Sequence, residues 1–366
     1  MLKPICLFFL FLMVLFSSGT AQGLDTAKVP IYEGGYALLD IWGFGPNDVY
    51  AVGRYGVVVH YDGLTWETIR NDATTFTCIW GTSPTNIYTT NSESIYHYDG
   101  ENWEIVFEGG EIAFISDIWG SGPDDIYAVG YNKILHYNGS QWEITYDNIQ
   151  GERFYAVWGS GPTDVFAGSE DRILHYDGST WSEMTDAFGG VTRLWGTAWN
   201  DVHAIGTRKI LHYDGMEWTL SLREEEIYLM GIWGSGPDDV YAVGTYGPYT
   251  RTRNLFHYDG EQWSYVDNDI ESALKAIWGS GPDDVFIIGS EWTIVHLGGP
   301  EVCIDNDGDG FGNPPSHLCQ YPALDCDDDY PHISPAGQED PFNDVDEDCN
   351  GELALDEGIC FISLFR

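Results

Sequence analysis

The chain has 366 residues and a formal net charge of −43, with 58 Asp and Glu against 15 Lys and Arg. A surface this acidic repels nucleic acids and anionic membranes, which excludes both as partners. Glycine (44), tyrosine (23) and tryptophan (15) are abundant. That composition is typical of many short strands joined by tight turns, so the sequence predicts an all-β protein.

The first 21 residues have the pattern of a secretory signal peptide. Lys3 supplies a positive charge, residues 5–16 form a continuous apolar run, and residues 19–21 are small enough for a cleavage site. The run is too short to cross a bilayer comfortably, so we expect no membrane insertion. We predict a signal peptide at 1–21 and a location outside the cell, either secreted or at the cell surface.

A unit of about 40 residues then recurs seven times. Each copy reads as an apolar pair with Trp-Gly, then Ser-Gly-Pro-Asp-Asp, Val-Tyr-Ala-Val-Gly and Ile-Leu-His-Tyr-Asp-Gly, with a second Trp shortly after. The Trp-Gly tryptophans are Trp42, Trp80, Trp119, Trp158, Trp195, Trp233 and Trp278. Four short strands per unit are typical of a β-propeller blade. Residues 22–300 are therefore predicted to form a seven-bladed β-propeller.

The third repeat illustrates the predicted strands, which we name A to D. Strand A ends at Trp119-Gly120, strand B covers 126–129, strand C covers 134–137, and strand D begins near Trp142. The last repeat lacks a strand D, and residues 28–32 precede the first repeat without a role. We expect residues 28–32 to be the outer strand of the last blade, which closes the ring and covers a sheet edge.

Two polar positions recur once in every blade. One is a histidine in strand C and the other an Asp before strand B, replaced by Asn in blade 2. The histidines are His60, His97, His136, His175, His212, His257 and His296, and the partners are Asp48, Asn86, Asp125, Asp164, Asp201, Asp239 and Asp284. A catalytic residue is needed once, so we interpret both sets as scaffold. We expect the histidines to tie neighbouring strands together and the aspartates to accept backbone N–H groups in the turns.

The repeat resembles that of Asp-box (BNR-like) propellers through residues 240–244 (Val-Tyr-Ala-Val-Gly) and 177–181 (Asp-Gly-Ser-Thr-Trp), and the resemblance extends over 38–297. This sequence differs in carrying His-Tyr before the Asp and one residue fewer between Asp and Trp. The family includes sialidases, assembly factors and binding scaffolds, so the resemblance implies architecture and not activity. The arginines needed to hold a sialidase carboxylate are scattered along the chain. We expect a non-enzymatic protein, with a sialidase-like, glycan-processing enzyme that uses the central channel as the alternative.

The B–C and D–A loops vary between repeats, whereas the A–B turns and C–D hairpins repeat almost unchanged. In a propeller the two variable sets emerge on one face, which we predict to be the binding face. Tyr, Trp and Arg are the residue types that anchor ligands. The predicted ligand-binding residues are Tyr55, Tyr131, Tyr246, Tyr249, Arg251, Arg253 and Trp292. The expected partner is an extracellular glycan or protein, bound by a monomer.

Residues 301–366 hold 17 acidic residues and five cysteines, Cys303, Cys319, Cys326, Cys349 and Cys360. In an exported protein this predicts a small disulfide-rich module, whose pairing stays open. Residues 305–310 place carboxylates at alternate positions followed by Gly, like the first half of a calcium loop. The predicted ligands are Asp305, Asp307, Asp309, Asp325, Asp327, Asp328, Asp344, Asp346 and Asp348. So many carboxylates favour calcium over copper.

This segment also resembles the MopE-type metal-binding motif of bacterial surface proteins. The matching residues are 305–312, 325–328, 331–335 and 346–351, and Phe342 stands where that family usually has a Cys. The resemblance implies a metal without specifying which. Together these features predict an exported binding or adhesion protein with a calcium-binding C-terminal module. A surface metal-scavenging protein is a further alternative.

Overall fold

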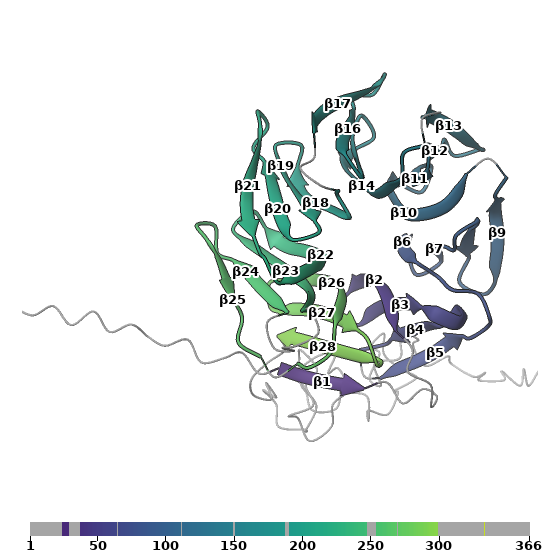
Figure 1. Cartoon of the computed structure of the whole chain (residues 1–366). Helices are drawn as coiled ribbons and strands as arrows, with labels where there is room; N and C mark the ends of the chain where they lie inside the picture. The colour runs from purple at the N-terminus through teal and green to yellow at the C-terminus, as the bar shows by residue number, and fades with distance from the viewer. Residues whose placement is uncertain are drawn as a thin grey trace, which may run out of the picture.

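The computed structural model describes residues 24–28, residues 37–298 and residue 333. Within 37–298 it leaves out residues 64, 111, 149–150, 187–189, 247–253 and 269. The described residues form seven four-stranded antiparallel sheets arranged as blades around a central channel (Figure 1). The prediction of an all-β, seven-bladed propeller is confirmed. The predicted signal peptide and, apart from residue 333, the predicted C-terminal module lie outside the described residues. Within the described part, no helix is long and apolar enough to span a membrane.

Each blade contains four consecutive strands, except the last. Blade 1 consists of β2 (Leu38–Gly45), β3 (Asp48–Gly53), β4 (Val58–Tyr61) and β5 (Trp66–Arg70). Blade 2 consists of β6 (Cys78–Ser83), β7 (Asn86–Thr90), β8 (Ser94–Tyr98) and β9 (Trp103–Glu108). Blade 3 consists of β10 (Ala113–Gly122), β11 (Asp125–Tyr131), β12 (Lys133–Tyr137) and β13 (Trp142–Asp147). Blade 4 consists of β14 (Phe154–Gly161), β15 (Asp164–Ser169), β16 (Arg172–Tyr176) and β17 (Trp181–Asp186). Blade 5 consists of β18 (Arg193–Ala198), β19 (Asp201–Gly206), β20 (Lys209–Tyr213) and β21 (Trp218–Arg223). Blade 6 consists of β22 (Ile227–Gly236), β23 (Asp239–Tyr246), β24 (Leu255–Tyr258) and β25 (Trp263–Tyr265).

The last blade is completed by the N-terminal segment. Its strands are β26 (Leu274–Gly281), β27 (Asp284–Gly289) and β28 (Thr293–Gly298), and β1 (Leu24–Lys28) pairs antiparallel with β28. Figure 1 shows β1 beside β28 at the edge of that sheet. The expectation that the N-terminal segment closes the ring is confirmed, but its placement at 28–32 was wrong. The residues that pair with β28 are the five from Leu24 to Lys28.

The hydrophobic core is divided among the blade interfaces. Each of seven clusters of buried apolar side chains joins residues of two neighbouring blades. Phe154 and Val157 of blade 4, for example, pack with Tyr127 and Val129 of blade 3. Because a four-stranded blade is apolar on both faces, it needs a neighbour on each side. The fold is therefore stable only as a closed ring.

The Trp-Gly pair of strand A determines how closely the blades pack. At six of the seven interfaces the indole of one blade lies against the Trp-Gly glycine of the next. A Cβ atom on Gly159 would lie 2.6 Å from Cη2 of Trp119. At the remaining interface, Trp42 Nε1 donates a hydrogen bond to the carbonyl of Gly81, at 3.1 Å. Glycine is required because a side chain would occupy the space of the indole.

The recurring histidines and aspartates form one hydrogen bond in every blade. Nε2 of the strand-C histidine lies 2.6 or 2.7 Å from Oδ1 of the residue that begins strand B. In five blades the second carboxylate oxygen accepts the hydroxyl of a Ser or Thr at the end of strand A. The expectation that the histidines tie strand C to a neighbouring strand is thus confirmed. For the aspartates the expected backbone partners are replaced by these side chains.

We predict that Gly159→Ala lowers the free energy of unfolding by about 1–3 kcal/mol, because the new methyl group collides with the Trp119 indole and overpacks the interface. Gly161→Ala is the matched control in the same strand, since nothing lies within 4 Å of its Cβ position. Denaturant midpoints of both variants test this. Equal effects would show that the indole does not limit the approach of the blades.

Candidate ligand-binding face

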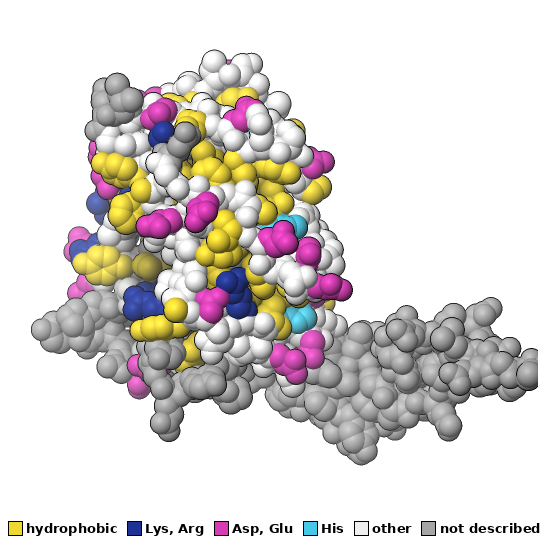
Figure 2. All heavy atoms as spheres, turned by 90° about the vertical axis from the view of Figure 1, so that its right-hand side faces the viewer, with side chains coloured by type: hydrophobic (Ala, Val, Ile, Leu, Met, Phe, Trp, Pro, Cys, Tyr) yellow, Lys and Arg dark blue, Asp and Glu magenta, His cyan; other side chains and the backbone are white. Residues whose placement is uncertain are grey.

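The two faces of the propeller differ in charge. The A–B turns and C–D hairpins contain no Lys or Arg. Within 37–298, every described Lys and Arg lies in a B–C or D–A loop or at a strand end beside one: Arg54, Arg70, Lys133, Arg153, Arg172, Arg193, Arg208, Lys209, Arg223 and Lys275. Figure 2 views the ring from the side, with histidines toward its right edge and most Lys and Arg toward its left and centre. The predicted binding face is therefore the face that carries the cations.

A cavity of about 400 Å³ opens on this face at the central channel. All seven blades contribute to its lining, mostly through the start of strand A: Leu39, Thr77, Ser92, Phe114, Ile115, Ser116, Arg153, Tyr155, Thr192, Arg193, Thr207, Tyr228, Leu229, Met230 and Lys275. Because strand A is the innermost strand of each blade, its first residues meet at the channel mouth. Ligand pockets combine such apolar walls with a few polar groups.

Arg153 stands between two aromatic rings of this cavity. Its guanidinium carbon lies 5.3 Å from the centroid of Phe114 and 5.0 Å from that of Tyr155. Its Nε is buried and has no hydrogen-bond partner among the described residues. Phe114 is 54% exposed and has φ of +55°, a strained conformation for a bulky residue. The backbone thus holds an apolar ring in solvent beside an incompletely satisfied cation.

A second cation–aromatic pair lies at the rim of the same cavity. The Arg208 guanidinium carbon is 4.5 Å from the Tyr228 ring centroid, and Arg208 Nη2 donates to the Tyr228 hydroxyl at 2.7 Å. Burial and the neighbouring Arg54 lower the pKa of Lys275. Within the described chain, no carboxylate forms an ion pair with Arg54, Arg153, Arg193, Arg208 or Lys275. In a chain of net charge −43, these cations gather where an anion would bind.

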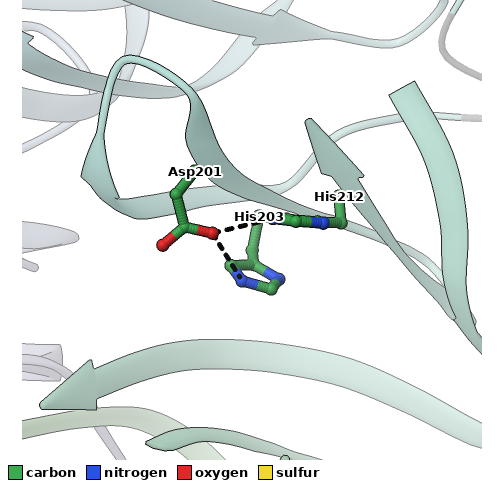
Figure 3. Close-up of side chains that lie close together, drawn as sticks. All are labelled: Asp201, His203 and His212. Atoms are coloured by element: carbon green, nitrogen blue, oxygen red, sulfur yellow. Dashed lines mark hydrogen bonds and ion pairs between the residues drawn. The ribbon is translucent and has the colours of Figure 1, made fainter. Parts of the chain in front are cut away.

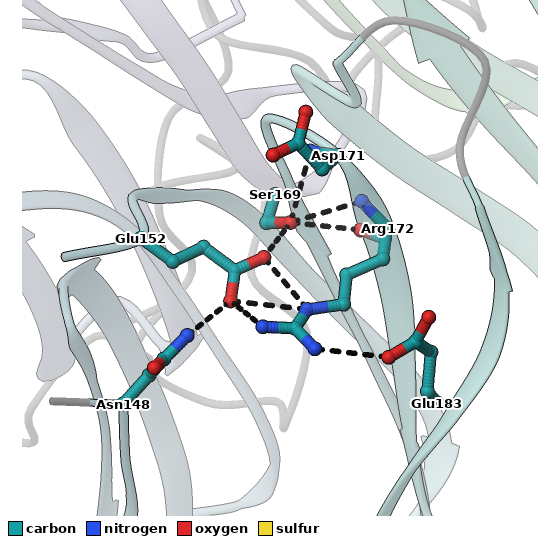
Figure 4. Close-up of polar contacts among 6 residues, drawn as sticks. All are labelled: Asn148, Glu152, Ser169, Asp171, Arg172 and Glu183. Carbon is teal, nitrogen blue, oxygen red and sulfur yellow. Dashed lines mark hydrogen bonds and ion pairs between the residues drawn. The ribbon is translucent and has the colours of Figure 1, made fainter. Parts of the chain in front are cut away.

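Other cations of this face are neutralised by ion pairs. Arg172 forms ion pairs with Glu152 at 2.6 Å and with Glu183 at 2.9 Å. Glu152 also accepts hydrogen bonds from Ser169 and Asn148, so the D–A loop before blade 4 is fastened to that blade's B–C loop (Figure 4). This network fixes loop geometry and leaves Arg172 committed to a structural role.

The channel wall below the mouth carries two carboxylates. Asp40, Cys78, Asp117 and Arg193 each precede a Trp-Gly tryptophan by two positions. Asp40 Oδ2 accepts the N–H of Ile79, and Asp117 Oδ2 accepts that of Val157, both at 2.9 Å. Each carboxylate therefore bonds to the next blade.

Desolvation perturbs these two carboxylates. Burial raises the pKa of Asp40 to about 6, opposed by the positive charge of Arg193. Burial also raises the pKa of Asp117 to about 7, again opposed by Arg193, while the charge of Asp40 adds to the rise. Neighbouring carboxylates with raised pKa values are a feature of acid–base sites as well as of structural hydrogen-bond networks.

The predicted ligand residues meet different outcomes. Tyr55 and Tyr131 are 50% and 41% exposed on the predicted face, although neither lines the cavity. Tyr246 ends β23. Trp292, which was also predicted to bind the ligand, is only 8% exposed and packs in the cluster between blades 7 and 1.

The remaining predicted residues lie outside the described part of the chain. They are Tyr249, Arg251 and Arg253, together with the predicted metal ligands Asp305, Asp307, Asp309, Asp325, Asp327, Asp328, Asp344, Asp346 and Asp348. Six residues that line the cavity were not predicted from the sequence: Phe114, Arg153, Tyr155, Arg193, Tyr228 and Lys275. Their signal was that strand A starts differently in each repeat, at positions that a closed ring brings together.

Known proteins resemble this chain in fold. The WD40 β-propeller domain of Doa1 matches with a TM-score of 0.63 at 10% identity, over 76% of this chain and 98% of that one. YCF48 bound to D1 peptide matches with a TM-score of 0.58 at 15% identity, over 76% and 97%. The extracellular domain of the one-component system BT4673 from B. thetaiotaomicron matches with a TM-score of 0.60 at 12% identity. The match covers 80% of this chain and 42% of that one. At these identities the likeness shows the seven-bladed fold alone. No family model and no curated protein sequence matches the chain.

We predict that Asp117→Asn changes the pH dependence of stability. With a folded pKa of about 7 against a usual value of 3.8, the folded state retains a proton between pH 4 and 7 that the unfolded state releases. The wild type therefore loses stability as pH rises through this window, on the order of 4 kcal/mol. Asn cannot ionise. In thermal melts the stability of the variant relative to that of the wild type should therefore rise as the pH is raised from 4.5 to 7.5.

The control for this experiment is Asp99→Asn. Asp99 is an exposed hairpin residue whose pKa is lowered by the N–H groups of Asn102 and Glu101. It titrates below the tested window, so its stability difference should stay flat. A flat difference for Asp117→Asn as well would mean that its carboxylate is already ionised at pH 4.5.

Proposed function

We propose that the protein is an exported binding protein whose propeller captures an extended, acidic segment of an extracellular partner protein at the channel mouth. The observation that carries the proposal is Arg153, a guanidinium between the rings of Phe114 and Tyr155 with a buried, unpartnered Nε. A carboxylate of the ligand would complete its hydrogen bonding, and charged hydrogen bonds of this kind are the strong ones.

The surroundings of Arg153 support an elongated ligand. Arg193 and Lys275 line the same cavity, Arg208 lies beside its rim residue Tyr228, and the exposed Phe114 offers apolar contact. A peptide with carboxylates on either side of an apolar residue matches this alternation. Among proteins of similar fold, YCF48 has been solved with a peptide bound, so a propeller of this shape can hold a peptide.

We predict that Arg153→Ala weakens capture of acidic peptides by roughly 10- to 100-fold, because one charged hydrogen bond is worth about 1.5–3 kcal/mol. A peptide array probed with the mature protein identifies the sequence, and titration calorimetry gives the affinity. Raising the ionic strength should weaken binding further, since the contact is electrostatic.

Arg223→Ala is the matched control, because Arg223 ends the outer strand β21 on the same face but away from the cavity. It should bind like wild type. Equal losses in the two variants, or retention of neutral and basic peptides only, would contradict the proposal. Retention of glycans with no peptide would favour a glycan ligand.

A glycan-processing enzyme is the second candidate, favoured by the raised pKa values of Asp40 and Asp117 near Arg193. Two carboxyl groups with unequal pKa values can serve as general acid and base. Release of sugars from surface glycans by the wild type, abolished in Asp117→Asn, would establish that function. If the wild type turned over none of the glycans in a panel, the enzymatic candidate would be wrong and the binding function would be the one that stands.

We further propose that residues 301–366 bind calcium, which rests on the alternating carboxylates at 305–310. We predict that calorimetry of the mature chain shows calcium binding that is weakened in Asp307→Ala. Such a substitution removes a ligand oxygen without touching a cysteine. Binding of copper in place of calcium would make the metal assignment wrong and would favour metal scavenging.

A further inference from the structure

Blade 5 differs from the other six at the middle of strand B. The residue that packs on the strand-C histidine is aromatic in those six blades: Tyr50, Tyr88, Tyr127, Phe166, Tyr241 and Phe286. In blade 5 it is His203, stacked on His212 with ring centroids 4.6 Å apart. A benzene ring has no nitrogen lone pair, whereas an imidazole has one to offer a ligand.

His203 is deeply buried and unsatisfied. It is 1% exposed, and neither Nδ1 nor Nε2 has a hydrogen-bond partner among the residues that the structure describes. Buried polar atoms without partners are rare and cost stability. Tyr or Phe fills the same position in the other six blades, so the two unpartnered nitrogens point to an interaction that the carbon ring of Tyr or Phe does not make at this point.

Three ligand atoms come together at this point (Figure 3). Asp201 Oδ1 lies 2.7 Å from His212 Nε2 and 3.7 Å from His203 Nε2. The three atoms all lie within 4.8 Å of one another. Ligand atoms around a tetrahedral zinc ion lie roughly 3.3 Å apart, given bonds of about 2.0–2.2 Å. Binding of an ion would therefore require the His203 ring to turn from its stacked position until its Nε2 comes within that range.

We propose that Asp201, His203 and His212 bind a divalent transition-metal ion of the zinc class in blade 5. Two imidazole nitrogens and one carboxylate oxygen are a common ligand set for such ions. The ion takes the place of the proton shared by Asp201 and His212, and His212 then carries its proton on Nδ1. The hydroxyl of Thr197 donates to Asp201 Oδ2 and orients the carboxylate, as outer hydrogen bonds do at metal sites.

The position of the cluster suits entry of a cation. His212 and Asp201 are 32% and 17% exposed at their side chains, so an ion reaches them from solvent while His203 closes the inner side. They lie toward the face whose turns and hairpins lack Lys and Arg. That face attracts cations, and its charge adds to the affinity of a surface-accessible site.

Zinc chloride is the probe, titrated calorimetrically into the mature chain with calcium in excess to occupy the acidic C-terminal segment. We expect the wild type to bind one zinc ion more than His203→Phe. This variant recreates the arrangement of blade 4, where Phe166 packs on His175 and Asp164 bonds to that histidine, so it should fold. Zinc should raise the melting temperature of the wild type and leave that of His203→Phe unchanged.

A gain-of-site variant provides the matched control. Phe166→His places the same three ligand types in blade 4, beside Asp164 and His175, and should add one zinc equivalent to the wild type. Equal zinc stoichiometry in wild type and His203→Phe would overturn the proposal. So would the absence of any binding at micromolar zinc in a folded wild type.

Discussion

The contact between an indole and a glycine, repeated around the ring, is the constraint on which the structure depends. Each blade buries its apolar faces only against its neighbours, and the Trp-Gly glycine lets the preceding indole approach the strand directly. A side chain at that glycine would separate two blades, and a closed ring transmits such a change to every interface. The N-terminal strand β1 belongs to the same constraint, because without it the sheet of the last blade ends at β28.

Repetition made most of this fold predictable from sequence. The repeat unit and the histidine of its strand C recur seven times. The number of copies gives the number of blades, and each position could be judged by comparing its copies. The errors fell where a copy is unique. Residues 28–32 were assigned to the missing strand because they precede the first repeat without another role, yet the ladder uses 24–28. Nothing in the sequence of its loop indicates that Trp292 packs between blades 7 and 1.

The candidate site could be predicted only in part, for a related physical reason. The loops that form the binding face follow from alternating strand direction, which places the B–C and D–A connections together. The cavity itself depends on ring closure, which brings Phe114, Arg153, Tyr228 and Lys275 together from four blades. Nothing in their separate sequence neighbourhoods pairs them. The same holds for Asp40 and Asp117, which are 77 positions apart. The positive charge of Arg193 lowers the pKa of both carboxyl groups.

The two faces carry different chemistry: cations and exposed aromatic rings at the channel mouth, carboxylates and imidazoles at the opposite turns. We propose that the partner binds at the mouth. Hydrogen–deuterium exchange of the mature protein, with and without the captured peptide, tests this most directly. The account predicts protection at the starts of β10, β14 and β22 and none in the Asp-Gly hairpins. Protection confined to those hairpins, with the channel mouth unchanged, would contradict it.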